Sequence, residues 1–318
     1  MKTKGMKKKQ AFLKSLLAAI LLGAPLAVSA QDVEINETNF PDENFRNWLL
    51  QQDYGADGIL TGMEISGITY INISNRNISN LTGIEHFTAL SNLVCYDNQL
   101  TALDLSKNTA LRNLDCYDNQ LTALDLSKNT ALITLDCYDN QLTALDVSGC
   151  TALTYLDCCN NQLTALDVPG CTALGEVDCS NNQLTTLDVS GCSTALGRLY
   201  CYRNQIKGAS MDALINSLPT PGGRLYVYDN SEGDEGNVCT KTQVEAIKAK
   251  GWKPYYSSTW WWEEYEGYDE ETGIVQPAMA TTDANEPVYT LSGQKVSNGS
   301  LKVKKGVYIV GGKKVVVK

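Results

Sequence analysis

Aspartate and tyrosine side chains recur at a fixed spacing in the middle of this chain and are its first candidates for chemistry. From Leu90 to Ile206 the sequence repeats every 21 residues. Aspartates on neighbouring copies would repel one another, so they should attract cations or basic partner groups, or become partly protonated. Tyrosine rings offer rigid amphipathic contact area and are enriched at binding hot spots. The candidate binding residues are Tyr96, Asp115, Tyr117, Asp136, Tyr138, Tyr155, Asp157, Asp178, Tyr200 and Tyr202.

Repeat duplication is an alternative explanation of the same stripe. Recent copies that have not diverged would keep these side chains without any ligand, while water and salt screen the charges. A second aspartate column, in the LTALD motif, is expected to be structural, because an aspartate before a turn can accept backbone N–H groups. Its members are Asp104, Asp125, Asp146, Asp167 and Asp188.

A short β-strand in each repeat would place these side chains on one side. Leu114 and Cys116 alternate with Asp115 and Tyr117. A strand there points the first pair inward and the second pair outward. A single coil can bury its apolar edges only by stacking on other coils. An asparagine follows each strand, and we expect its amide to bond the turn backbone of its own and adjacent coils. This column is Asn98, Asn119, Asn140, Asn161, Asn182 and Asn204.

The eleven cysteines fit the repeat better than a disulfide framework. Cysteine packs as a small hydrophobic residue, so two cysteine ladders are interpreted as buried thiols and not as disulfides or metal ligands. Cys159 is the exception, because it lies on the outward side beside Cys158, and its thiol is expected to be reactive. The inward column is Cys95, Cys116, Cys137, Cys158, Cys179 and Cys201, and the second ladder is Cys150, Cys171 and Cys192.

Each copy reads LxxLxCxxNxL, which resembles the leucine-rich repeat. The resemblance implies an α/β leucine-rich-repeat solenoid, in which a curved parallel sheet lines the concave side and a short irregular convex side completes each coil. The repeats are assigned to residues 68–207, a helical N-terminal cap to 31–67, and larger terminal coils with a C-terminal cap to 208–271. A linker at 272–285 and a small β module at 286–318 complete the chain.

Residues 1–30 have the form of a secretory signal peptide, with cleavage expected near Ala30. Six lysines precede an apolar run from Leu16 to Leu22, which is too short to compete as a membrane span. Loss of these lysines on cleavage changes the formal net charge from −10 to −16, and this acidity disfavours a nucleic-acid partner. We expect a secreted or cell-surface protein without a transmembrane span.

The N-terminal cap carries a candidate calcium loop. A helix is predicted at Asn39–Gln52. The twelve residues that follow resemble the calcium loop of an EF-hand. The resemblance implies ligation by Asp53, Asp57, Glu64 and the carbonyl of Ile59, although Gly55 stands where the pattern has Asp or Asn. The alternative is a cap that keeps the loop shape without an ion, and no cofactor is required.

The C-terminal part contains two further signals. Trp260, Trp261 and Trp262 are consecutive, so they cannot all face one core. Either a cap buries alternate rings, or the rings form a platform that stacks on sugars. After Glu286 the chain has seven lysines and no acid, and it reads as short strands with a hairpin at residues 311–312. This segment resembles the sorting domains of the Bacteroidetes type IX system, which implies export and surface attachment.

Together these segments resemble bacterial surface leucine-rich-repeat proteins of the internalin and BspA kind. The resemblance implies a non-enzymatic protein that binds a protein or glycan partner through the concave face, and a passive surface coat is the alternative. A calcium-dependent polysaccharide lyase is disfavoured, because it needs a base among the acids and only Arg112 flanks an early acidic rung. His86 is the sole histidine, which excludes a Ser-His-Asp triad and a histidine metal cluster.

Overall fold

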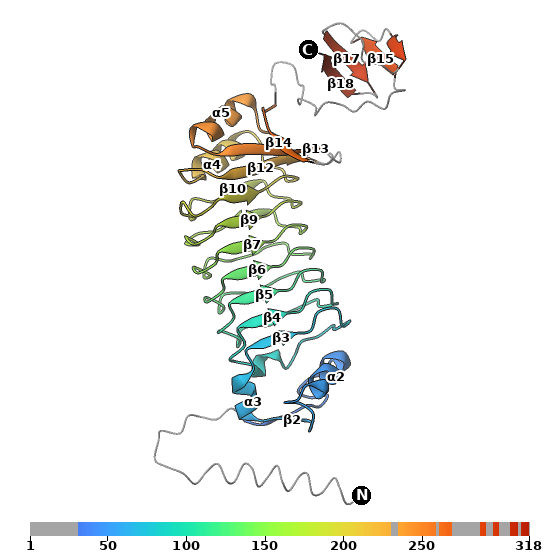
Figure 1. Ribbon diagram of the computed structural model, residues 1–318, viewed down its shortest axis with the longest axis vertical. Helices are drawn as coiled ribbons and strands as arrows, with labels where there is room; N and C mark the ends of the chain where they lie inside the picture. Colours follow the sequence, from blue (N-terminus) through green and yellow to red (C-terminus); the bar gives the residue numbers. More distant parts are fainter. Residues whose placement is uncertain are drawn as a thin grey trace, which may run out of the picture.

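The computed structural model describes residues 31–229, 235–258 and 261–268, together with four C-terminal strands within 287–317. The predicted signal peptide and the predicted linker at 272–285 lie outside the described residues. Most of the described chain forms a stack of coils, each of which contributes one short strand to the same sheet (Figure 1).

The sheet has ten strands in the order β14-β13-β12-β11-β9-β7-β6-β5-β4-β3. All neighbours pair in parallel except β13 and β14. The parallel strands are β3 (Tyr70–Asn72), β4 (Asn92–Val94), β5 (Asn113–Asp115), β6 (Thr134–Asp136), β7 (Tyr155–Asp157), β9 (Glu176–Asp178), β11 (Arg198–Tyr200), β12 (Arg224–Asp229) and β13 (Lys253–Ser258).

Register across the sheet is fixed by one buried residue at the centre of each short strand. Leu93 pairs with Leu114, and Leu114 pairs with Leu135. All three are fully buried, whereas the residues on either side of them are half-buried. Because a slip of one residue would expose the leucine, hydrophobic burial selects this register. The fold predicted from the repeat is confirmed.

The asparagine after each strand joins consecutive coils, as the sequence predicted. Asn119 Nδ2 donates to three carbonyl oxygens at 3.1 Å each, one in the preceding coil and two in its own. Its Oδ1 accepts from the Leu100 N–H of the preceding coil at 3.0 Å. These bonds satisfy backbone groups that the turn would otherwise bury without partners.

The returning arms contain the second aspartate column, which has the structural role expected of it. The Oδ1 atoms of Asp104, Asp125 and Asp146 each accept the backbone N–H two residues later, at 2.9 Å. Hydrogen bonds from the side chain and the backbone N–H of the serine two residues later lower the pKa of these three carboxyl groups. Two members of the column lie in the short paired strands β8 (Ala165–Asp167) and β10 (Thr186–Asp188).

The second cysteine ladder continues a ladder of buried asparagines. Asn108 and Asn129 precede Cys150 at the same 21-residue spacing, and each donates from Nδ2 to two backbone carbonyls. Cys150 Sγ lies 3.7 Å from the Asn129 carbonyl oxygen. In later copies a thiol therefore fills the space of an amide.

The N-terminal end of the stack is closed by a small cap. Strand β1 (Val33–Glu34) pairs with β2 (Ile59–Leu60), and helix α2 (Glu43–Gln51) buries Phe45 and Leu49. Helix α2 begins later than predicted, because Asp42 is its N-cap and accepts the Phe45 N–H at 3.0 Å. Helix α3 (Gly62–Gly67) and the 3-10 turn η1 (Ile84–His86) lie between the cap and the first regular coil.

The opposite end is closed by larger coils. Helices α4 (Ala209–Ser217) and α5 (Lys241–Ala249) replace the returning arms, and the antiparallel strand β14 (Trp261–Glu264) ends the sheet (Figure 1). A separate four-stranded sheet has the order β16-β15-β17-β18. Its strands are β15 (Pro287–Thr290), β16 (Lys295–Asn298), β17 (Gly306–Val310) and β18 (Lys313–Val317).

Candidate binding surface

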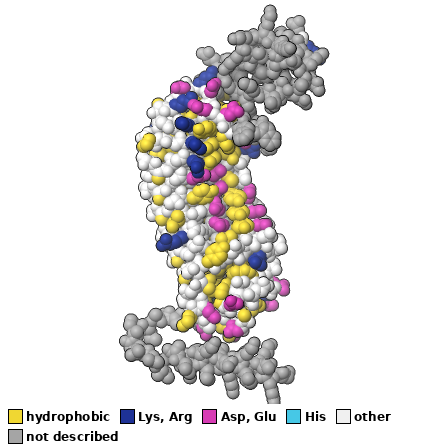
Figure 2. All heavy atoms as spheres, in the orientation of Figure 1, with side chains coloured by type: hydrophobic (Ala, Val, Ile, Leu, Met, Phe, Trp, Pro, Cys, Tyr) yellow, Lys and Arg dark blue, Asp and Glu magenta, His cyan; other side chains and the backbone are white. Residues whose placement is uncertain are grey.

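The outward side chains of the ten-stranded sheet form a surface that we call the sheet face. The first residue of each strand, its last residue and the residue two positions beyond it supply three columns of side chains, and all ten candidate residues from the sequence lie in these columns. Apolar and acidic side chains gather along one strip over the strands in Figure 2. The structure therefore brings the predicted residues together on one side, although their binding role remains a prediction.

A stack of tyrosine rings runs along the sheet face. The Tyr96 and Tyr117 ring centroids are 4.3 Å apart with planes 7° apart, and Tyr117 and Tyr138 repeat this geometry at 4.3 Å and 9°. Strand spacing sets the stacking, since parallel strands lie about 4.8 Å apart. Burial, followed by the neighbouring Tyr138, raises the pKa of the Tyr117 hydroxyl.

The aspartate column lies beside the tyrosine stack. Asp115, Asp136, Asp157 and Asp178 occupy one position in consecutive strands and are half-buried. Burial, with Asp115 and Asp157 as neighbouring charges, raises the pKa of Asp136 to about 6. Burial also raises the pKa of Asp178 to about 6, against the opposing effect of its bond from Ser180. These carboxylates therefore carry a desolvation cost that a cationic partner would offset.

Cys159 lies among these carboxylates, and the prediction that its thiol is reactive is wrong. The Sγ of Cys159 and one carboxylate oxygen each of Asp157 and Asp178 lie within 4.8 Å of one another. Burial first, and then the two carboxylates, raise the pKa of the half-buried thiol well above its usual range. A protonated, shielded thiol is a poor nucleophile. The strand pattern predicted that the Cys159 side chain points outward, but it did not predict that carboxylates surround the thiol.

The C-terminal end of the sheet face is aromatic, a feature that the sequence reading only partly found. Tyr200 and Tyr226 stack with centroids 4.1 Å apart, and Tyr226 lies 5.3 Å from Tyr255. Trp262, on β14, packs its ring against Tyr226 at 4.7 Å and Tyr202 at 5.2 Å. Trp262 thus extends the sheet face and is 39% exposed. The Tyr-x-Tyr pattern at 226–228 repeats the one at 200–202, and it could have predicted that the aromatic surface continues here.

A short basic column borders this aromatic end and was missed from the sequence. Arg198 pairs in register with Arg224, and Arg224 pairs with Lys253. These side chains are exposed, and dark blue groups line up along the same edge of the strip in Figure 2. Arg198 forms an ion pair with Glu176 of the preceding strand at 2.6 Å. The spacing between these strands departs from 21 residues, so the column could not be read from the repeat.

Comparison with known proteins identifies the architecture. The family model described as "Leucine Rich repeats (2 copies)" matches residues 130–175 and 151–191, which contain β6, β7, β9 and their returning arms. The fold is a leucine-rich-repeat solenoid.

Relatives of this solenoid include internalins. Internalin J of Listeria monocytogenes serotype 4b is 40% identical over 70 residues, which is 22% of this chain and 8% of Internalin J. The solved functional domain of InlJ, described as including a cysteine ladder, is 30% identical with a TM-score of 0.50, over 69% of this chain and 56% of that one. Internalin C2 of the same species has a TM-score of 0.54 at 20% identity, over 72% of this chain and 98% of its own, and supports the fold alone.

The solenoid itself contains the predicted ladder of packed thiols. All six cysteines of the inward column are fully buried and free. Burial raises the pKa of each thiol well above its usual range, as for Cys137. Cys150, Cys171 and Cys192 are buried and free as well, so the interpretation of both cysteine columns as core is confirmed. Within the described part of the chain, none of the helices has the length and apolarity of a membrane span.

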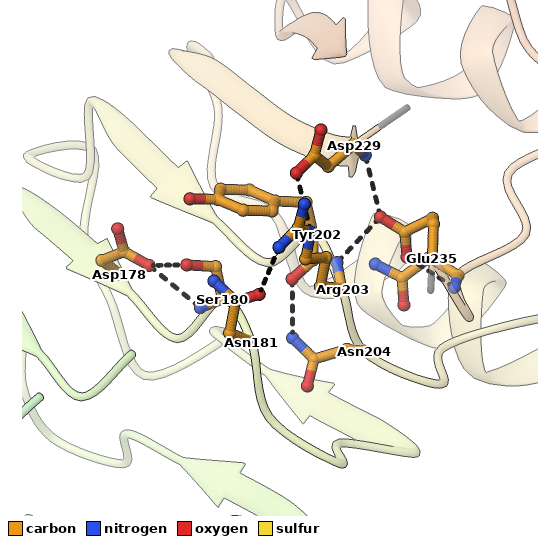
Figure 3. A network of polar contacts seen from close by, with 9 residues as sticks. Asp178, Ser180, Asn181, Tyr202, Arg203, Asn204, Asp229 and Glu235 are labelled. Atoms are coloured by element: carbon orange, nitrogen blue, oxygen red, sulfur yellow. Dashed lines mark hydrogen bonds and ion pairs between the residues drawn. The ribbon is translucent and has the colours of Figure 1, made fainter. Parts of the chain in front are cut away.

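A buried polar network fastens the last regular coil of the solenoid to its terminal coils (Figure 3). Arg203 has a left-handed backbone, with φ of 51°, and its Nε lies 2.7 Å from Asp229 Oδ2. Glu235 Oε2 accepts the backbone N–H groups of Arg203 and Asp229 at 2.8 and 2.9 Å. Burial raises the pKa of Glu235 to about 7. The network holds the ends of β11 and β12 together.

The candidate calcium residues do not converge in the cap of this structure. Both the backbone N–H and the hydroxyl of Thr61 donate to Glu64 Oε2, at 2.8 and 2.7 Å, in a helix capping box. Asp57 Oδ1 accepts the Ile59 N–H at 3.1 Å. Among the described residues, the sole set of three acidic or thiol ligand atoms within 4.8 Å is the one around Cys159, so Asp53, Asp57 and Glu64 form no such set. In this arrangement the three carboxylates form no ligand set, and calcium binding stays an untested prediction.

Proposed function

We propose that this protein is a non-enzymatic binding protein of the bacterial cell surface or its surroundings, and that the sheet face contacts a protein partner. The observation that carries the proposal is the continuous tyrosine stack beside half-buried aspartates. Rigid aromatic groups and desolvated charges are the features that dominate binding energy at interfaces. Leucine-rich-repeat proteins commonly bind protein partners, which supports this choice.

Secretion or surface attachment is supported by three separate features. The chain begins with the lysine-rich and apolar pattern of a signal peptide and ends in a lysine-rich segment similar to sorting domains. Its relatives include internalins. We propose that residues 286–318 direct export, and that the solenoid is the part exposed to partners.

Binding is favoured over catalysis by what surrounds the acids. A lyase would need a base close to the aspartate column. Arg198 and Arg203, on the coil after Asp178, are held by Glu176 and Asp229 respectively. The matched family and relative are repeat and internalin proteins, neither of which is an enzyme family.

The proposal can be tested with the mature chain on protein and glycan arrays and on intact cells. A triple variant, Tyr117→Ala, Asp136→Asn, Tyr138→Ala, should lose at least tenfold in affinity for any protein target that the parent binds. The matched control, Asp125→Asn with Asp146→Asn on the returning arm, should change affinity less than twofold. If the triple variant binds as tightly as the parent, the sheet face is not the binding surface, and absence of any target for the parent would favour a passive coat.

Calcium at the cap loop is a separate proposal with its own test. Calorimetry with calcium chloride on the parent and on Asp53→Ala would detect an ion at this loop. The loop would need to rearrange, since the Glu64 carboxylate caps helix α3. Heat of binding that disappears in Asp53→Ala would support the loop site, and its absence in the parent would remove calcium from the account.

A further inference from the structure

The tyrosine stack on the sheet face is interrupted at one place. Tyr96, Tyr117 and Tyr138 occupy one column, and the next two positions in that column are Cys159 and Ser180. Tyr138 stacks on Tyr117 on one side, and its ring has no stacked neighbour on the side of Cys159. The column resumes with Tyr202.

Because of Tyr202, the interruption of the tyrosine column is confined to one coil. Its ring extends over Ser180 in the direction of Asp178 in Figure 3, and Ser180 is fully buried. Cys159, by contrast, is half-buried. The break in the aromatic column therefore lies at Cys159, between the rings of Tyr138 and Tyr202. We call this break the Cys159 gap.

Two carboxylates form the floor of the Cys159 gap. Asp157 Oδ1 accepts the backbone N–H of Cys159 at 3.0 Å. Asp178 Oδ1 accepts the backbone N–H and the hydroxyl of Ser180 at 2.9 and 2.6 Å (Figure 3). The backbone N–H bonds to both groups use Oδ1, and the Cys159 thiol also hydrogen-bonds Asp157. In the described part of the chain neither carboxylate has an ion-pair partner.

The protein's own cations nearby are committed elsewhere. Arg198 binds Glu176 and Arg203 binds Asp229. The left-handed turn residue Asp139 adds a further negative charge, which acts on both Asp157 and Cys159. The Cys159 gap is thus a partly desolvated, negatively charged break in an aromatic surface.

We propose that the Cys159 gap is an anchor subsite for an arginine side chain of the protein partner. A planar guanidinium can stack on the open side of Tyr138 and donate to Asp157 and Asp178 in the same pose. This inference rests on the proposed function, because it names the chemistry that the sheet face recognises. A lysine side chain has no planar group that could stack on Tyr138 in place of the missing tyrosine ring. An uncharged sugar would leave both carboxylates desolvated without a counter-charge.

A metal ion is the less suitable occupant of the same groups. Thiolate is the form of cysteine that binds metals, and the surroundings of Cys159 favour the protonated thiol. The two aspartates would then supply the only strong ligands among the three groups. A guanidinium can bind without deprotonation of Cys159, and it can also stack on the Tyr138 ring, with which a metal ion would make no such contact.

The test uses the chain from residue 31 to 318 and a fluorescent peptide made of five Gly-Arg repeats. Binding is measured by fluorescence anisotropy in 150 mM salt. Asp157→Asn with Asp178→Asn should weaken binding at least tenfold. Asp125→Asn with Asp146→Asn makes the same change of net charge on the returning arm and should weaken binding less than twofold. The equivalent lysine peptide should bind several-fold more weakly.

A matched pair at Cys159 separates size from thiol chemistry. Cys159→Tyr would complete the tyrosine column without changing net charge and should weaken arginine-peptide binding at least tenfold. Cys159→Ser keeps the gap and should retain binding within twofold. Denaturant unfolding of each variant confirms folding, and the aspartate pair tests the gap independently if the tyrosine variant does not fold.

The outcomes distinguish the alternatives. If the two double aspartate variants lost the same amount of peptide affinity, the binding would reflect general charge attraction, and the proposed arginine subsite would be overturned. Binding lost in EDTA and in Cys159→Ser would instead indicate a metal site. Tighter peptide binding after removal of residues 286–318 would indicate that the chain's own lysine-rich segment occupies the gap. If array targets depend on Tyr117 and Tyr138 but not on Asp157 and Asp178, the proposed function stands and the arginine subsite falls.

Discussion

At the scale of single residues, side-chain amides inside the solenoid take over the role of backbone hydrogen bonds. Each turn must leave its strand and continue to the returning arm, which exposes carbonyl and N–H groups to a dry interior. One asparagine per coil satisfies four of these groups and does so across two coils. The same residue therefore closes its own turn and fixes the spacing to its neighbour.

Replacement of Asn119 by alanine should lower the free energy of unfolding by about 1–3 kcal/mol, because the buried Leu100 N–H would lose its acceptor. The three carbonyls would each lose one donor but keep another, from Asn98, Asn140 or the Asp97 N–H. Urea denaturation would measure the change. Asn113→Ala provides the control, since Asn113 is half-exposed on the sheet face and should be within about 0.5 kcal/mol of the parent. Equal effects in both variants would contradict this role.

The aspartate column should make stability depend on pH. The pKa values of Asp136 and Asp178, raised to about 6, mean that the folded state binds more protons than the unfolded state. Their contribution to stability therefore falls as pH rises from about 4 through 6. Asp136→Asn with Asp178→Asn should gain relative to the parent between pH 4.5 and 7.5, by up to about 1 kcal/mol per site after allowance for exposure.

Urea unfolding of the parent and the double variant at the two pH values measures this gain. A difference between parent and variant that stays constant over the range would show that these two carboxyl groups titrate normally.

The thiols should be almost inert in the folded protein. Ten of the eleven cysteines are buried, and the pKa of Cys159 is raised by burial and by Asp157 and Asp178. At pH 8 Ellman's reagent should react with the native protein at least about 100-fold more slowly than with a free thiol. Unfolding in urea should release all eleven. A rapid thiol that disappears in Cys159→Ser would restore the reactive cysteine that the structure argues against.

At the scale of elements, the junction between the regular repeats and the terminal coils depends on a close backbone approach. A Cβ on Gly223, just before β12, would lie 2.3 Å from the carbonyl oxygen of Gly197, just before β11. A Cβ on Gly197 itself would meet its nearest atoms at 3.7 Å, an ordinary contact. Two glycines in equivalent positions thus face different constraints.

Gly223→Ala should destabilise the protein by about 1–3 kcal/mol, because β11 and β12 must separate to admit the methyl group. Gly197→Ala should remain within about 0.5 kcal/mol of the parent. Thermal and urea unfolding of both variants would compare them. Similar stability of the two alanine variants would show that the junction relaxes without cost.

At the scale of the whole molecule, each coil shares its core with its neighbours, so the ends need covers. Helix α2 and strand β1 cover the first coil, and α5 with β14 covers the last. Stability in such a stack is approximately the sum of coil and interface contributions. Strands β15 to β18 pair only with one another in the described part of the chain. The solenoid should therefore not depend on them.

A chain that ends at residue 271 should unfold with the same thermal midpoint as the chain that ends at 318, within about 2 °C, because a domain with its own core folds alone. Scanning calorimetry on both proteins tests this division. A fall of more than about 5 °C would show that the C-terminal strands pack on the solenoid and that the proposed boundary at 272–285 is misplaced.

The sequence by itself determined the in-and-out pattern of every regular coil. A period of 21 residues with alternating leucine, cysteine and polar positions allows one buried register, so the thiol ladders, the asparagine bonds and the outward stripe followed from local chemistry. The sequence also predicted that larger coils close the C-terminal end of the solenoid.

Only the tertiary structure decided which side chains meet across coils of unequal length. Trp262 joins Tyr202 and Tyr226 because β14 folds back on β13, and Arg224 joins Arg198 across a coil that contains a helix. The surroundings of Cys159 likewise depend on Asp178, one coil further along, and on the course of Tyr202. A repeat fixes the direction of a side chain, whereas solvent exclusion and charge depend on all its neighbours in space, which no local spacing specifies.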